Sequence, residues 1–194
     1  MQAAEKVFSE KGFLKATVSE IARLSQVAEG TVYEYFQNKE DLLLRASERR
    51  LDGYIAELPE LFEIRNPVRK LRRFIKYFYL RFFVDRDFLK VFLLEIQLSF
   101  RFLGSRAYEK FLKYWQALEE IIEEGKAGGY FRPDVNPRVF RNMFVGTFNN
   151  LTLRWFILQR DKEADKVNEL NHLTDLLCAS VTSSDQTDRM GLTD

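Results

Sequence analysis

Residues 17–41 read TVSEIARLSQVAEGTVYEYFQNKED, and this stretch determines which fold and which function to look for first. Thr17 begins a short helical pattern and Glu20 follows three residues later, which is the spacing of a capping box. Residues 26–28 form a tight turn, and a second helical pattern follows over about 29–36. Two short helices joined in this way are the layout of a helix-turn-helix, which places its second helix in the major groove of DNA.

The whole chain reads as helical, with no sustained alternation of apolar and polar residues that would indicate strands. Asn66-Pro67 and Asn136-Pro137 each predict a helix start, because asparagine can cap a helix whose first residue is proline. About nine helices are expected, over residues 2–12, 17–25, 29–36, 38–54, 67–84, 87–102, 105–127, 137–160 and 164–182. The predicted fold is all-α, with a three-helix DNA-binding domain over 1–48, a helical effector-binding and dimerisation domain over 49–182, and a disordered tail over 183–194.

Composition excludes several classes of protein. The chain has 194 residues, a formal net charge of +1 and a single cysteine, Cys178, so neither an intramolecular disulfide nor a multi-cysteine metal site can form. No apolar stretch approaches the ~20 residues that span a bilayer, and no secretory signal is visible, so a cytoplasmic protein without a membrane partner is expected. His172 has no nucleophile at a suitable spacing and no glycine-rich phosphate loop is present, so an enzyme, a cofactor and a metal are not expected.

Several residues around the second helix suit contact with DNA. Small or hydrogen-bonding side chains at the start of a reading helix allow close approach to base edges, and tyrosine hydroxyls, a lysine and a helix N-terminus suit phosphates. The predicted DNA contacts are Thr17, Ala28, Gly30, Thr31, Tyr33, Tyr35 and Lys39.

The local charge argues against strong binding by one copy. Residues 1–50 hold eight Lys or Arg and eight Asp or Glu, whereas neutralisation of phosphates supplies most non-specific affinity for DNA. A three-helix packing unit with no groove contact is the alternative that these residues leave open.

The segment AAEKVFSEKGFLKATVSEIARLSQVAEGTVYEYFQNKEDLLL resembles the N-terminal domain of the TetR family of bacterial transcriptional repressors. The resemblance covers about residues 2–48 and rests on Phe8, Gly12, Phe13, Thr17, Ile21, Ala22, Gly30, Thr31, Tyr33, Tyr35, Phe36, Lys39 and Glu40. It implies that Thr31, Tyr33 and Tyr35 contact DNA and that Lys39 contacts a phosphate. Glu29 departs from the family, which often has a basic residue at this position.

The resemblance also implies a two-fold homodimer whose four-helix interface comes from helices near the C-terminus. The regions 137–160 and 164–182 are the candidates, and such a dimer would present two reading helices ~34 Å apart to a palindromic operator. The predicted interface residues are Phe140, Leu151, Trp155, Leu170, Leu173 and Leu177.

The family resemblance further implies a central cavity for a small effector, and the chain has 18 phenylalanines that form either solid core or a pocket wall. The predicted lining is Phe74, Phe78, Phe82, Phe92, Ile96, Phe100, Trp115, Phe144 and Phe148. Residues 65–90 hold nine Lys or Arg against two acidic groups, which indicates either a solvated helix face or a site for an anionic head group.

A long-chain acyl-CoA would satisfy both features. The segments LLEIQLS, AYEKF, IIEEGKAGGYFRPDVNP and GTFNNLTLRW are similar to fatty-acid-degradation repressors within the family. A different hydrophobic effector of the multidrug type, and a helical ligand-binding protein that no longer reads DNA, are the alternatives.

Overall fold

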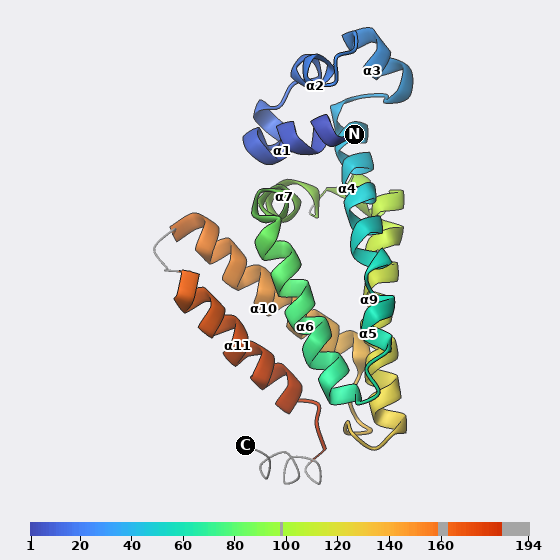
Figure 1. Cartoon of the computed structure of the whole chain (residues 1–194), viewed down its shortest axis with the longest axis vertical. Helices are drawn as coiled ribbons and strands as arrows, with labels where there is room; N and C mark the ends of the chain where they lie inside the picture. The colour runs from blue at the N-terminus through green and yellow to red at the C-terminus, as the bar shows by residue number, and fades with distance from the viewer. Residues whose placement is uncertain (98, 159–162, 184–194) are drawn as a thin grey trace. The chain divides into compact units, whose positions relative to one another are not determined.

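The structure is a computed structural model that describes residues 1–97, 99–158 and 163–183. For residues 81–83, 156–158, 163 and 164 it describes the backbone and not the side chains. Its helices are α1 (Gln2–Lys15), α2 (Val18–Leu24), α3 (Glu29–Tyr35), α4 (Lys39–Ala56), α5 (Pro59–Phe62), α6 (Pro67–Val84), α7 (Arg86–Val91), the π-helical η1 (Phe92–Ile96), α8 (Phe100–Leu103), α9 (Arg106–Ala127), α10 (Pro137–Leu158) and α11 (Glu163–Ala179) (Figure 1). The all-α prediction is confirmed, and in the described ranges the β structure is limited to one isolated bridge between Phe131 and Thr182. Within those ranges no helix combines the length and the apolar character that a bilayer crossing requires. Of the predicted disordered tail, 183–194, Ser183 is described and donates its N–H to the Tyr130 carbonyl, and residues 184–194 lie outside the described residues.

Helix starts follow the capping residues that the sequence indicates. The Asn66 side chain accepts a hydrogen bond from the backbone N–H of Arg69 at 3.0 Å, one turn into α6. Asn136 does the same at the start of α10, where its Oδ1 accepts from the N–H groups of Arg138 at 3.0 Å and Val139 at 3.2 Å. These caps satisfy N–H groups that have no partner inside the helix, which fixes where each helix begins.

The prediction of a single helix over 87–102 is wrong, because this stretch forms α7, η1 and α8. α7 runs directly into η1, where the N–H of Gln97 donates to the carbonyl of Phe92 at 2.9 Å, five residues back. A new helix, α8, then begins at Phe100 after Ser99, whose hydroxyl accepts from the N–H of Arg101. The apolar periodicity of this stretch continues across the break, so periodicity alone could not reveal it. The short α5 was not predicted either.

The chain divides into two compact units. The first unit contains Met1–Ala56 and Phe82–Tyr114, and the second contains Glu57–Arg81 and Trp115–Asp194. This division follows packing and not the predicted functional segments, so the predicted domain boundary after residue 48 stays a prediction.

In the first unit, α1 turns sharply near its end. Gly12 adopts φ +73° and ψ 171° inside α1, a backbone conformation that residues with a Cβ rarely adopt. The sequence predicts a helix stop at this glycine, and the structure places the interruption there. Val7 and Phe8 on the preceding turn are buried, so this unit packs the inner face of α1.

In the second unit, α10 and α11 lie side by side (Figure 1), and the Arg154 guanidinium on α10 pairs with Glu169 on α11 at 2.6 Å. The end of α11 is fixed to the turn after α9 by two backbone hydrogen bonds, from Arg132 N–H to the Val181 carbonyl at 2.9 Å and from Ser183 N–H to the Tyr130 carbonyl at 3.0 Å. These two hydrogen bonds hold the chain after α11 against the segment between α9 and α10.

Candidate DNA-reading and effector-binding sites

The helix-turn-helix is built by α2, the turn at residues 25–28 and α3. The predicted capping box is confirmed: the Thr17 hydroxyl accepts from Glu20 N–H at 3.2 Å, and the Glu20 carboxylate accepts from Thr17 N–H at 3.4 Å. Gln26 adopts φ +57°, which reverses the chain tightly enough to bring α3 back against α2. Thr17 therefore has a structural role, and its predicted phosphate contact stays a prediction.

One face of α3 is free to meet a partner. Val32 is buried and attaches α3 to the unit, while Tyr33 and Tyr35 expose 51% and 76% of their surfaces. A side-chain carbon added to Gly30 would meet nothing within 4 Å, so this part of the helix lies in open space. Ala28, directly before α3, is exposed, and Thr31 on α3 is partly exposed. The predicted base-reading residues thus lie on one accessible helix or at its start, and their contact with DNA stays a prediction.

Lys39 is placed differently from the sequence-based expectation. Its ammonium donates to the carbonyl of Phe13 at 2.7 Å, to that of Ala16 at 3.0 Å and more weakly to that of Leu14 at 3.4 Å. It also lies 4.5 Å from the centroid of the Phe13 ring. An ammonium has three N–H donors, so Lys39 here neutralises the end of α1. Its predicted phosphate contact stays a prediction and would require the ammonium to release one of these carbonyls.

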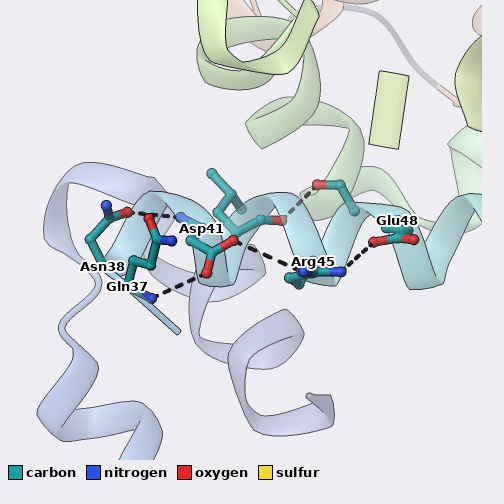
Figure 2. Close-up of polar contacts among 7 residues, drawn as sticks. Gln37, Asn38, Asp41, Arg45 and Glu48 are labelled. Atoms are coloured by element: carbon teal, nitrogen blue, oxygen red, sulfur yellow. Dashed lines mark hydrogen bonds and ion pairs between the residues drawn. The ribbon is translucent and has the colours of Figure 1, made fainter. Parts of the chain in front are cut away.

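A polar chain fixes the start of α4 directly after the reading helix (Figure 2). Asn38 Oδ1 accepts from Asp41 N–H at 2.9 Å, and an Asp41 oxygen accepts from Gln37 N–H at 3.2 Å. Arg45 then lies between Asp41 at 3.9 Å and Glu48 at 3.3 Å. Because Arg45 has these two carboxylates beside it, its charge is already matched within the protein.

We call residues 1–50 the head region, and two of its cations that sequence reasoning did not single out have no carboxylate partner in the part of the chain that the structure describes. Lys15 and Arg23 are exposed, and neither forms an ion pair with the described residues. Lys11 instead pairs with Glu20, and this contact holds the pKa of the Glu20 carboxyl below its usual value. Exposure together with the lack of a local partner is visible only in the structure, so the sequence offered no signal that separated these two from the other basic residues.

The head region is also held by the segment around η1 within the first unit. The Glu95 carboxylate accepts from the backbone N–H of Phe13 at 2.7 Å, next to the turn in α1. Glu40 in the first turn of α4 accepts from the Ser99 hydroxyl at 3.2 Å and pairs with Arg101 at 2.9 Å. Two carboxylates thus connect η1 and α8 to the helices that frame α2 and α3.

Five of the predicted effector-site residues come together in the second unit. Phe78 is central: its ring centroid lies 5.1 Å from those of Trp115 and Phe144 and 4.9 Å from that of Phe148. Phe74 joins through Trp115 at 6.3 Å. All five side chains are buried, and Tyr79, which was not predicted, stacks on Phe148 with centroids 5.1 Å apart. We call Phe74, Phe78, Tyr79, Trp115, Phe144 and Phe148 the aromatic cluster.

The other predicted lining residues lie outside the second unit's cluster as described. Phe92 and Ile96 belong to the first unit, where Phe92 packs against Phe102 with ring centroids 5.5 Å apart. Phe100 is 91% exposed because it is the first residue of α8 and points away from the core. The side chain of Phe82 lies outside the described residues. The lining by all nine residues therefore stays a prediction.

The basic residues of α6 divide into paired and unpaired groups. Lys70 is buried and forms an ion pair with Glu124, and Arg72 pairs with Asp175 on α11. The cations that form no ion pair with the described residues are Arg65, Arg69, Arg73 and Lys76. The last three follow helical spacing and make one basic stripe on α6.

The predicted dimer residues mostly pack inside the protomer. Phe140, Trp155, Leu170 and Leu177 are buried, and Leu151 and Leu173 are partly buried. Their regular spacing marks the inner face of each helix, so the interface stays a prediction for these residues. The neighbouring outer faces expose Val139 and Met143 on α10 and Val167 and Leu176 on α11.

Comparison with known proteins agrees with this architecture. Residues 1–46 match the model of bacterial regulatory proteins of the tetR family, and residues 47–179 match that of the C-terminal region of YsiA-like proteins. The fatty acid metabolism regulator protein of Bacillus subtilis is 29% identical over 182 residues, which is 93% of this chain and 93% of that protein.

Two solved structures resemble the chain along most of its length. The transcriptional regulator FadR from Bacillus subtilis, in complex with stearoyl-CoA, gives a TM-score of 0.79 at 29% identity, over 91% of this chain and 95% of that one. The fatty acid degradation regulator FadR from Bacillus halodurans gives 0.77 at 28% identity, with the same coverage of both chains. The two family models together extend from residue 1 to the end of α11. The chain therefore belongs to the TetR family and is a DNA-binding transcriptional regulator.

Proposed function

We propose that this protein is a cytoplasmic repressor that binds a palindromic operator as a two-fold dimer and releases it when a long-chain acyl-CoA binds. The choice of a long-chain acyl-CoA as effector depends on one observation. Nearly the whole chain is similar to a fatty acid regulator whose structure contains stearoyl-CoA. The reading surface, the aromatic cluster and the basic stripe support the proposal from the side of the molecule itself.

Operator recognition is assigned to the exposed face of α3. Gly30 and Ala28 permit close approach of the backbone to base edges, while Thr31 supplies a hydroxyl. Tyr33 and Tyr35 are exposed and can donate to phosphates. Lys15 and Arg23 add the charge that Lys39 does not supply in this conformation.

Effector recognition is assigned to the second unit. The aromatic cluster offers six rings for an acyl chain, and the basic stripe of α6 offers guanidinium and ammonium groups for phosphates. Ring centroids in the cluster lie close together, from 4.9 Å between Phe78 and Phe148 to 6.3 Å between Phe74 and Trp115. The rings must therefore part to admit a chain, and a ligand that fits only the parted arrangement shifts the protein toward it.

Dimerisation is assigned to the outer faces of α10 and α11. Val139 and Met143 are exposed one turn apart on α10, followed by Gly146, whose surroundings are open. Glycine lets two helix backbones approach closely, and an isologous dimer would place this face against its own copy. Binding to the operator needs the head regions of two protomers, because one head region is neutral overall and has few cations without a carboxylate partner to offer to phosphates.

The decisive experiment is a gel shift with the DNA upstream of the protein's own gene. Protein freed of ligand should retard the fragment, and stearoyl-CoA should release it, whereas free CoA at the same concentration should not. The Tyr35→Phe and Thr31→Ala variants should bind the fragment more weakly, while Tyr77→Phe on α6 should bind as the wild type does.

Each part of the proposal can fail separately. Retardation that saturating stearoyl-CoA leaves unchanged would remove the acyl-CoA assignment and favour a different apolar effector. Retardation that neither α3 substitution weakens would contradict the reading helix. The relatives are named regulators, so stearoyl-CoA should be recovered intact after incubation, and hydrolysis would contradict a purely regulatory role.

A further inference from the structure

Tyr79 of the aromatic cluster has a hydroxyl group that its ring contacts do not require. Its side chain is 2% exposed, stacks on Phe148 at 17° between ring planes and meets Phe144 edge-on with centroids 5.6 Å apart. A phenylalanine would make all of these ring contacts. The surrounding sequence, FIKYFYLRFF, shows that phenylalanine is common on this helix.

The Tyr79 hydroxyl is buried and has no hydrogen-bond partner among the described residues. A buried hydroxyl without a partner destabilises the folded protein, because it loses its hydrogen bonds to water and gains nothing in return. Burial also raises the pKa of Tyr79 well above its usual value, so the phenol keeps its proton and can act as a donor. The hydroxyl is therefore a buried donor that lies among the rings of the aromatic cluster.

The surroundings of this hydroxyl become more polar toward the surface. Cys178 of α11 is the other polar group that acts on Tyr79, and Cys178 is in turn influenced by the charges of Arg72, Asp175 and Lys76, two of which are positive. Arg72, Lys76 and Tyr79 are spaced by four and three residues and so share one face of α6. An apolar chain among the rings would end near Tyr79, and an anionic head would continue toward Lys76, which is partly exposed and forms no ion pair with the described residues.

We infer that the Tyr79 hydroxyl donates a hydrogen bond to the carbonyl oxygen at the head of the bound acyl chain. The inference rests on the proposed acyl effector and adds the residue that locates the boundary between its chain and its head. The carbonyl belongs to the thioester of an acyl-CoA or to the carboxyl of a free fatty acid, and these sources share the chemistry that the phenol recognises. Tyr79 thus makes the site selective for acyl groups over plain hydrocarbon chains.

The test compares ligands with and without the carbonyl. Dissociation constants of stearoyl-CoA, of S-octadecyl-CoA, whose thioether lacks the carbonyl, and of stearate are measured by calorimetric titration. Wild-type protein should bind the thioester about 3- to 10-fold more tightly than the thioether, as expected for one hydrogen bond. In Tyr79→Phe this ratio should fall to about one. Affinity for stearate that also falls in Tyr79→Phe would extend the same contact to the free acid.

Tyr77→Phe is the matched control. Tyr77 lies two residues away on α6, and its hydroxyl donates to Glu57 at 2.8 Å. Its loss should lower the melting temperature and leave the thioester-to-thioether ratio unchanged. Tyr79→Phe should instead melt at the same temperature as wild type or higher, because it removes an unsatisfied hydroxyl.

The outcomes distinguish the inference from the proposed function. If wild type binds both CoA derivatives equally, or if the ratio survives in Tyr79→Phe, the role of Tyr79 is overturned while the acyl-CoA effector stands. If wild type binds none of the three ligands, the effector class itself is wrong. A large destabilisation in Tyr79→Phe would show that the hydroxyl serves the fold.

Discussion

Glu95 connects the π-helical turn to the head region through one short hydrogen bond. Its carboxylate accepts from Phe13 N–H at 2.7 Å, and a side-chain carbon on Gly12 would approach Glu95 Oε1 to 3.1 Å. The positive φ of Gly12 is what turns the Phe13 N–H out of the helix and toward this acceptor. A charged acceptor on a backbone N–H makes a stronger hydrogen bond than a neutral one.

We expect Glu95→Ala to lower the free energy of unfolding by about 1–3 kcal/mol, because the partly buried N–H loses its acceptor. Urea denaturation measures the loss, and hydrogen exchange at Phe13 should quicken. Glu95→Gln keeps an acceptor oxygen and should recover most of the stability. Equal stability of the alanine variant and wild type would show that the bond contributes nothing.

Cys178 provides a probe of the second unit, because it is the chain's single cysteine. Its side chain is 3% exposed, and burial raises the pKa of the thiol from 9.0 to about 11. The thiolate is the reactive form, so at pH 8 native protein should react with iodoacetamide roughly 100-fold more slowly than unfolded protein, from the pKa difference alone. Equal rates in native and urea-unfolded protein would contradict the burial.

The same shift has a defined effect on stability. The folded thiol keeps its proton up to about pH 11, whereas the unfolded chain loses it near pH 9. The unfolded state therefore binds fewer protons between these values, so the contribution of Cys178 to stability is complete below pH 9 and falls as pH rises toward 11. A Cys178→Ala variant should show a shallower loss of melting temperature over this range.

Helix boundaries were predictable where a local residue sets them. The caps at Thr17, Asn66 and Asn136 could be read from the sequence because each acts on N–H groups within three residues of itself. The break at η1 could not, because the apolar spacing of the 87–102 stretch continues through it. Nor could sequence spacing tell that Phe100 is exposed, since orientation depends on where α8 starts.

The DNA-reading and effector sites also could be predicted only where the signal is local in sequence. The reading helix was found because its turn and cap are local signals, while the pairing of Lys39 with the end of α1 joins residues more than twenty positions apart. On α10 the sequence showed a regular aromatic stripe but not which surface it packs against. The structure shows that Phe140 and Phe144 face the protomer's own core.

Because these rings face inward, the opposite face of α10 is exposed, and its predicted role in dimerisation can be tested. We expect Met143→Glu to convert the dimer to monomers in analytical ultracentrifugation, because it places a charge on each side of an apolar two-fold contact. Circular dichroism should show unchanged helix content, since Met143 is 43% exposed. Leu112→Glu on α9 is the matched control, as Leu112 is equally exposed and lies on neither α10 nor α11. A dimer that survives Met143→Glu would place the interface elsewhere.

The charge balance of the whole protein determines how it can hold DNA. With a net charge of +1 the molecule has no general attraction to a polyanion. Most basic residues of the head face a carboxylate of the same unit, as Arg45 and Lys11 do, so counting residues overstates the charge available to phosphates. Lys15 and Arg23 remain in each head, which makes four such cations in a dimer.

The salt dependence of operator binding should reflect this small number. Four neutralised phosphates predict a slope of log K against log salt of roughly −3 to −4, whereas engagement of all eight Lys and Arg in each head would give a slope of about −14. Lys15→Gln and Arg23→Gln should each reduce the slope by about two, because every substitution occurs twice in the dimer. Lys39→Met should lower stability and leave the slope nearly unchanged, since its ammonium is bound to the carbonyls of Phe13 and Ala16. A slope that falls by two in Lys39→Met would instead show that this ammonium leaves α1 and binds a phosphate when DNA is present.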